Sequence, residues 1–128
     1  MANELILIVE DNDKNMKLAR DILQVKGYRT IEAESAEAGL PLVAERKPDL
    51  VLMDIQLPGM NGIEALKKLR ASPETSRIPV LAFTASVMPQ DRKEIMSAGF
   101  DGFVSKPINL KEFIASIANT LVKPGGAA

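Results

Sequence analysis

Five short apolar runs, separated by segments with helical spacing, constrain the fold of this chain more than any other feature. Strands that alternate with helices in this way favour a parallel sheet, and right-handed crossovers then place helices on both of its faces. We predict an α/β fold with a doubly wound sheet of five parallel strands in the order 2-1-3-4-5. The predicted strands are Leu5 to Val9, Tyr28 to Ala33, Leu50 to Met53, Val80 to Phe83 and Phe103 to Ser105.

The segments between these runs carry helix signals. A first helix is predicted from Asn12 to Lys26, with Gly27 as its stop, and a fourth from Gln90 to Ala98, with Gly99 as its stop. The apolar residues that define the spacing of the first helix are Leu18, Ala19, Ile22, Leu23 and Val25.

The third and last helices are marked by residues that suit helix ends. The third is predicted to begin near Asn61 and to close at Ser72 and Pro73, whereas Asn109 and Glu112 form a capping-box pattern at the start of the last helix. The apolar residues expected to face the sheet are Ile63, Leu66 and Leu69 in the third helix and Leu110, Phe113, Ile114, Ile117 and Leu121 in the last.

The second helix contains a proline well past its first turn. If Ser35 caps this helix, Pro41 removes a backbone hydrogen bond and crowds the preceding turn. The sequence therefore predicts either a kink or a late start for this helix.

Length and composition fit one compact unit. The chain has 128 residues, of which 46% are apolar, and this is enough for one hydrophobic core. Residues 3–122 are predicted to form a single domain, and residues 123–128, KPGGAA, a flexible tail.

Charge and hydropathy exclude several classes of partner. The 16 basic and 17 acidic residues give a net charge of -1, so the broad cationic surface needed to follow a nucleic-acid backbone is missing. The apolar run near the start, LILIV, follows an acid and is far shorter than a membrane span. We expect a soluble, cytoplasmic protein that binds neither nucleic acid nor membrane.

The absence of cysteine and histidine restricts the possible metal chemistry. Disulfides, thiolate metal sites and imidazole ligands are all excluded by this composition. Any bound metal must be a hard cation held by oxygen atoms.

Acidic residues stand at the ends of two predicted neighbouring strands. Glu10 and Asp11 follow the first strand and Asp54 follows the third, so their carboxylates are expected to meet at one edge of the sheet and to repel one another. A bound Mg²⁺ would relieve that repulsion, with Asp11 and Asp54 as ligands and Glu10 acting through water. The alternative is that residues 10–13 merely cap the first helix.

A hydroxyl and an ammonium end the two remaining strands at the same predicted edge. Thr84 and Lys106 are placed to contact the oxygens of a phosphoryl group carried by Asp54, which would then be the nucleophile toward a phosphodonor. Taken singly, Thr84 simply starts a turn and Lys106 is simply solvated. Their shared position at strand ends favours the functional interpretation.

Four motifs carry a resemblance to a known family. VEDN at residues 9–12, LMDIQLPGMNG at 52–62, FTAS at 83–86 and SKP at 105–107 resemble, in order and spacing, the receiver domain of two-component response regulators. The resemblance covers nearly the whole chain and implies a flavodoxin-like fold. It also implies a signalling role in which the protein catalyses only its own phosphorylation and dephosphorylation.

The resemblance also implies roles for individual residues. Asp54 would be the phosphoacceptor, Glu10 and Asp11 the acidic pair, and the backbone carbonyl of Gln56 a further Mg²⁺ ligand. Thr84 and Phe103 would form the switch pair that changes the surface of the fourth helix, fifth strand and fifth helix. Phe103 is also a plausible core aromatic.

The resemblance implies further local features. The peptide bond between Lys106 and Pro107 is expected to be cis. Gln56 and Ser86 stand at positions that tune hydrolysis of the phosphorylated state.

Other functions remain as alternatives. A Mg²⁺-dependent phosphohydrolase of the haloacid dehalogenase class uses similar residues, but its nucleophile motif has a second Asp at the position of Gln56. An FMN carrier needs a phosphate cradle after the first strand, where the acids of EDND would repel the phosphate. A third alternative is a receiver that signals by protein binding without phosphorylation.

The expected partners follow from the resemblance and the chain length. A sensor histidine kinase or a histidine phosphotransfer protein would supply or receive the phosphoryl group, and a downstream target protein would read the switched surface. Asn15, Met16 and Leu18 lie beside the predicted site and form a candidate docking patch, with Met16 expected to be exposed. Core packing is the alternative for Leu18.

Overall fold

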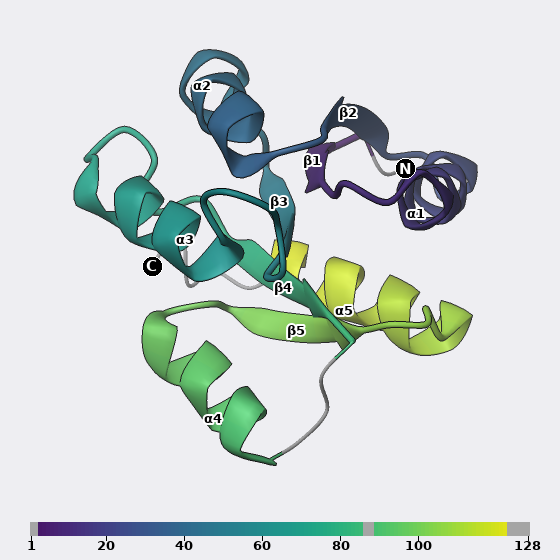
Figure 1. Cartoon of the computed structure of the whole chain (residues 1–128). Helices are drawn as coiled ribbons and strands as arrows, with labels where there is room; N and C mark the ends of the chain where they lie inside the picture. Colours follow the sequence, from purple (N-terminus) through teal and green to yellow (C-terminus); the bar gives the residue numbers. More distant parts are fainter. Residues whose placement is uncertain (1–2, 86–88, 123–128) are drawn as a thin grey trace.

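The computed structural model describes residues 3–85 and 89–122 and contains a parallel sheet of five strands (Figure 1). The strand order is β2-β1-β3-β4-β5, which confirms the predicted topology. The bounds agree with the predicted runs to within one residue at each end. The strands are β1 (Leu5–Val9), β2 (Arg29–Ala33), β3 (Leu50–Asp54), β4 (Val80–Thr84) and β5 (Gly102–Ser105).

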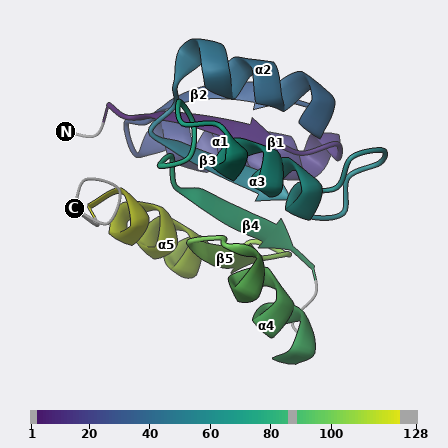
Figure 2. The same ribbon diagram turned by 90° about the vertical axis from the view of Figure 1, so that its left-hand side faces the viewer.

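Helices cover both faces of the sheet. Helices α1 and α5 pack together on one face, and α2, α3 and α4 lie on the other (Figures 1 and 2). Among the described residues, no helix has the length and apolar character needed to cross a bilayer. The helices are α1 (Asp13–Val25), α2 (Ala36–Arg46), α3 (Gly62–Ala71), α4 (Pro89–Ala98) and α5 (Leu110–Val122).

The sheet separates two hydrophobic cores. Every residue of β1, β3 and β4 is buried, as expected for central strands that are covered on both faces. Alternate residues of β1 serve the two sides: Leu7 and Val9 pack toward α2 and α3, and Ile6 and Ile8 pack toward α1 and α5. The three central strands are therefore packed on both faces, and this packing fixes the positions of the residues at their carboxyl ends.

The buried face of α1 differs from the predicted one. Met16, Ala19 and Leu23 are buried at helical spacing, whereas Leu18 is 45% exposed and Val25 is 83% exposed. The prediction that Met16 is exposed is therefore wrong, and the alternative of core packing for Leu18 is excluded. A helix turns through about 100° per residue, so Met16 and Leu18 lie on opposite sides of it.

Of the two alternatives predicted for α2, a kink or a late start, the late start is wrong. Ser35 caps the helix by accepting a hydrogen bond from the amide of Ala38 (3.1 Å), and the helix begins at the next residue and continues through Pro41. Pro41 is exposed, so solvent can reach the carbonyl of Glu37 that lacks an amide partner.

Caps place α3 and α5 as predicted. Asn61 and Glu64 form a complete capping box at α3, and Asn109 accepts a hydrogen bond from the amide of Glu112 (3.1 Å) at α5. In the stripe of α5, Phe113 and Ile117 are buried, but Leu110 is 57% exposed. The prediction that Leu110 faces the sheet is wrong because its first-turn position lies at the rim of the core.

Candidate functional site

The carboxyl ends of four strands bring the predicted site residues to one edge of the sheet. Asp54 and Thr84 are the last residues of β3 and β4, and Glu10 and Lys106 directly follow β1 and β5. Backbone hydrogen bonds hold these ends: the amide of Glu10 donates to the carbonyl of Ala33 (3.0 Å), and the amide of Lys106 donates to the carbonyl of Thr84 (2.8 Å). The parallel register therefore fixes where each functional side chain starts.

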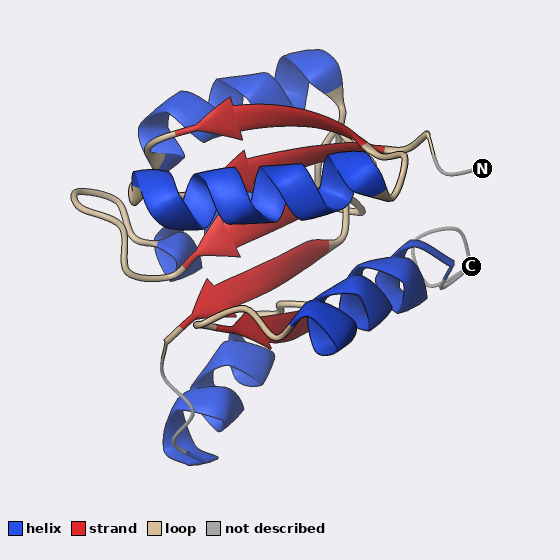
Figure 3. Ribbon diagram, turned by 90° about the vertical axis from the view of Figure 1, so that its right-hand side faces the viewer, coloured by secondary structure: helices blue, strands red, loops and turns tan. Residues whose placement is uncertain are grey.

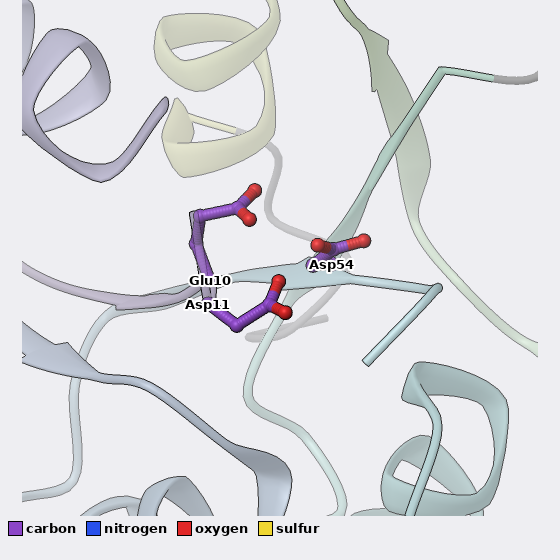
Figure 4. A group of neighbouring side chains, drawn as sticks. All are labelled: Glu10, Asp11 and Asp54. Atoms are coloured by element: carbon purple, nitrogen blue, oxygen red, sulfur yellow. The ribbon is translucent and has the colours of Figure 1, made fainter. Parts of the chain in front are cut away.

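Three carboxylates converge at this edge. Glu10, Asp11 and Asp54 each offer an oxygen within 4.8 Å of those of the other two, and Figure 4 shows the three side chains pointing toward one another. Glu10 is 1% exposed and Asp54 is 3% exposed, whereas Asp11 is exposed. Two of the three carboxylates are thus largely withdrawn from water, and their negative charges need compensation.

Lys106 supplies one positive charge to this group. Its ammonium lies 2.7 Å from Glu10 Oε1 and 3.0 Å from Asp54 Oδ2, and 4.7 Å from the centre of the Phe83 ring. Three carboxylates and one ammonium leave a formal charge of -2. That charge matches one divalent cation.

The remaining carboxylate oxygens have partners that orient them. The amide of Asn12 donates to Glu10 Oε2 (2.9 Å), and the amide of Gln56 donates to Asp54 Oδ1 (2.9 Å). Glu10 Oε1 is buried and approaches Lys106 as an ion pair without the alignment of a hydrogen bond. This oxygen is under-coordinated, as expected beside a site for a hard cation.

Glu10 and Lys106 both have raised pKa values. Burial raises the pKa of Glu10, and the negative charge of Asp54 adds to this, against the opposing effects of Lys106 and the amide of Asn12. Burial alone would lower the pKa of Lys106, but the carboxylates of Glu10 and Asp54 outweigh burial and raise it. Lys106 is therefore held in its charged form at neutral pH, where it can stabilise added negative charge.

Mg²⁺ fits the chemistry of these residues. The acidic cluster offers only oxygen ligands, carries the charge that a divalent ion neutralises, and includes one exposed carboxylate beside which the ion can keep water molecules. The acidic cluster predicted from the sequence, Glu10, Asp11 and Asp54, is thus assembled in the structure.

The remaining predicted residues in the described chain lie on β4, on β5 and in the loop that follows β3. Thr84 is 2% exposed at the end of β4, and Gln56 follows Asp54 by two residues in the β3–α3 loop. Phe103 lies on β5, half-buried on the side of α4 and outside the acidic cluster. Ser86 lies outside the described residues, and the Lys106–Pro107 peptide is cis, as the resemblance implies.

Sequence reasoning missed two residues, one that contacts Phe103 and one that contacts the loop after Asp54. The guanidinium carbon of Arg92 on α4 lies 5.1 Å from the centre of the Phe103 ring, and Glu37 on α2 contacts the loop that follows Asp54. Both contacts join residues from different elements, so no local motif could have indicated them.

The fold and the site together define a signalling domain that accepts a phosphoryl group with Mg²⁺. Residues 6–118 match the family described as response regulator receiver domain, and the chain belongs to this family. It is a two-component signalling protein, not an enzyme that turns over a separate substrate, so the phosphohydrolase alternative is not supported.

Relatives with known names sharpen this assignment. The chain is 45% identical over 116 residues to the polar-differentiation response regulator DivK of Brucella ovis, covering 91% of this chain and 94% of the relative. It is 44% identical, with the same coverage, to DivK of Brucella anthropi. The segments VEDN, NMKL and MDIQLP by themselves resemble DivK. The comparison over 116 residues confirms that resemblance.

Solved structures agree with the fold. A response regulator from Chloroflexus aurantiacus superposes with a TM-score of 0.90 at 28% identity, covering 94% of this chain and 99% of the other. The receiver domain of a sensor histidine kinase from Pseudomonas aeruginosa, with a magnesium ion in its active-site cleft, gives a TM-score of 0.87 at 27% identity and the same coverage. As a receiver, this chain has a histidine kinase as its partner.

Proposed function

We propose that Asp54 accepts the phosphoryl group and that Lys106 and Thr84 contact the transferred oxygens. The observation that carries this proposal is the position of the Asp54 carboxylate, which lies within 4.8 Å of two other carboxylates and 3.0 Å from the Lys106 ammonium at the strand edge. Glu10, Asp11, Asp54 and the backbone carbonyl of Gln56 are the proposed ligands of Mg²⁺, which neutralises charge on the acids and on the phosphoryl group.

The proposed reaction is a transfer between two nucleophiles. A carboxylate oxygen of Asp54 forms a bond to phosphorus as the bond from phosphorus to a histidine nitrogen of the donor breaks, and the imidazole keeps the electron pair. A carboxylate has no proton to lose, so no general base is needed. Lys106 stabilises the charge on the phosphoryl oxygens, and the amide of Gln56 holds the other carboxylate oxygen of Asp54 in place.

The proposed output is a change of protein surface. Thr84 is buried beside the acceptor and Phe103 is half-buried on the next strand, so a movement of the hydroxyl toward a phosphoryl group can be followed by the ring. The surface of α4, β5 and α5 would change with it and be read by a downstream target protein. Arg92, which lies over the Phe103 ring, is positioned to take part in that surface.

The setting of this activity is proposed from the same observations. Residues 3–122 act as the receiver unit in the cytoplasm, and the predicted tail at 123–128 lies outside the described residues. Balanced charge argues against nucleic acid as a direct partner. The phosphoryl group comes from, or passes to, a sensor kinase or a histidine phosphotransfer protein.

The test of the acceptor is covalent labelling with a small phosphodonor. Incubation with acetyl phosphate and Mg²⁺ should add one phosphate to the wild type, measured by intact mass, and none to Asp54→Asn. Asp13→Asn is the matched control, because Asp13 is exposed in the first turn of α1 and outside the acidic cluster. Labelling of Asp54→Asn to the wild-type level would refute the assignment of Asp54.

The docking patch for the histidine-containing partner is proposed to include Leu18 and Asn15, without Met16. Leu18 is exposed on α1, whose amino-terminal end adjoins the site, and its loss removes apolar contact area. Leu18→Ala should slow phosphotransfer from the kinase about tenfold, while labelling by acetyl phosphate stays unchanged. Val25→Ala, exposed at the far end of the same helix, is the control. Equal kinase rates for both variants would remove Leu18 from the patch.

A further inference from the structure

The loop from residue 55 to residue 61 connects Asp54 to α3 and projects beyond the carboxyl edge of the sheet (Figure 3). Both ends of this loop are fixed near the sheet. At its start the amide of Gln56 donates to Asp54 Oδ1 (2.9 Å), and at its end the amide of Gly62 donates to the carbonyl of Ile55 (3.0 Å). The middle of the loop needs a separate anchor.

Glu37 provides that anchor from α2. Its Oε2 accepts a hydrogen bond from the amide of Met60 (3.1 Å), which joins residues 23 positions apart in the chain. The same oxygen lies against Gly59, where an added Cβ would come within 2.7 Å of it. Gly59 has φ +74°, so the backbone conformation favours glycine there.

The acceptor itself is well placed. Glu37 is the second residue of α2, and the Ser35 cap fixes the start of that helix. Hydrogen bonds from its own amide and from that of Met60 lower the pKa of Glu37, so the carboxylate is ionised at neutral pH.

We propose that Glu37 is a positioning residue for phosphorylation, which holds Gly59 and Met60 so that Gln56 presents its amide to Asp54 and its carbonyl to Mg²⁺. This inference rests on the proposed function of Asp54 and Gln56. A loop that is already ordered loses less conformational freedom when the cation binds, so the anchor raises Mg²⁺ affinity without contacting the ion. Glu37 thereby couples α2 to the Mg²⁺ affinity of the acceptor site. α2 lies on the opposite face of the sheet from α1, which carries the proposed kinase patch.

The test compares Glu37→Ala with Glu37→Gln and Glu45→Ala. The Gln side chain keeps a carbonyl oxygen that can accept from Met60, and Glu45 is an exposed glutamate of the same helix without a contact to the loop in the described chain. Mg²⁺ affinity is measured by calorimetry, and hydrogen exchange of residues 59–62 by mass spectrometry. Labelling by acetyl phosphate is followed as a function of Mg²⁺ concentration.

For Glu37→Ala we expect faster exchange of residues 59–62 and a Mg²⁺ affinity lower by about two- to tenfold, the range for loss of one hydrogen bond. Its labelling rate should return to the wild-type value at saturating Mg²⁺, and Glu37→Gln and Glu45→Ala should both match the wild type. Equal Mg²⁺ affinity in Glu37→Ala and Glu45→Ala, or failure of Glu37→Gln to restore it, would overturn the proposal. Absence of labelling in the wild type would instead refute the proposed function, because the exchange and affinity measurements do not depend on labelling.

Discussion

At the scale of single residues, Glu10 shows that a cation site lowers the stability of the protein when no cation is bound. The carboxylate is buried beside Asp54, and the single positive charge of Lys106 cannot neutralise the three negative charges of Glu10, Asp11 and Asp54. Because burial raises the pKa of Glu10, the folded protein keeps that proton to a higher pH than the unfolded chain. The stability from this group is fully present below the ordinary pKa of a glutamate and is lost as the pH rises through the raised folded pKa.

Glu10→Gln should therefore stabilise the metal-free protein at neutral pH. We expect the free energy of unfolding in urea with EDTA to rise at pH 7.5, with the gain shrinking as the pH falls through the raised pKa of Glu10 and vanishing below the ordinary glutamate pKa of about 4.3. With Mg²⁺ in excess the order should reverse, because binding stabilises the wild type more. Glu45→Gln, at an exposed position, should change neither value. A metal-free Glu10→Gln protein less stable than the wild type would contradict this account.

Much of the site was predictable from the residues, for one physical reason. In a parallel sheet the residue that follows each strand must reach the same edge, so Glu10, Asp54 and Lys106 could be grouped from the sequence alone. The contacts of Glu37 and Arg92 could not, because they depend on how separate helices pack and on side-chain direction.

At the scale of elements, the start of α3 fixes the loop that follows Asp54. A Cβ on Gly62 would lie 2.5 Å from the backbone oxygen of Asp54 and 2.8 Å from Ile55 Cα. Backbone atoms cannot move aside as a side chain can, so this close approach holds the end of β3 against the first turn of α3. Glycine is needed here for space.

Gly62→Ala should displace the end of β3 and disturb the acceptor. We expect a loss of about 2 kcal/mol in the free energy of unfolding, typical of overpacking, together with slower labelling by acetyl phosphate. Gly102→Ala is the control, since its nearest neighbour is the flexible end of Leu81 at 3.1 Å. If the two variants were equally stable and equally reactive, the contact at Gly62 would have no role in positioning Asp54.

Helical spacing predicted which segments form helices better than it predicted their buried faces. In α1 the apolar residues occur on more than one side, so the choice between Met16 and Leu18 depended on where α1 meets the sheet and α5. Pro41 likewise weakened α2 locally, but the packing of Ala36 and Val43 against the sheet outweighed it.

At the scale of the whole molecule, stability depends on two cores that share one sheet. Phe113 is fully buried in the core of α1 and α5, while Leu110, three residues earlier on α5, is 57% exposed. Phe113→Ala should lower the free energy of unfolding by about 3–5 kcal/mol, measured in urea. Leu110→Ala should change it by less than about 0.5 kcal/mol. Similar losses for the two would show that both residues are core residues, contrary to the structure.

The two outer strands of the sheet differ from the three between them. β2 exposes the charged residues Arg29 and Glu32, and β5 has only four residues. The charged edge strand β2 and the short edge strand β5 both discourage a second copy of the chain from extending the sheet by backbone hydrogen bonding. A receiver that must stay free to meet its histidine kinase is thereby protected from assembling into a continuous sheet with its own copies.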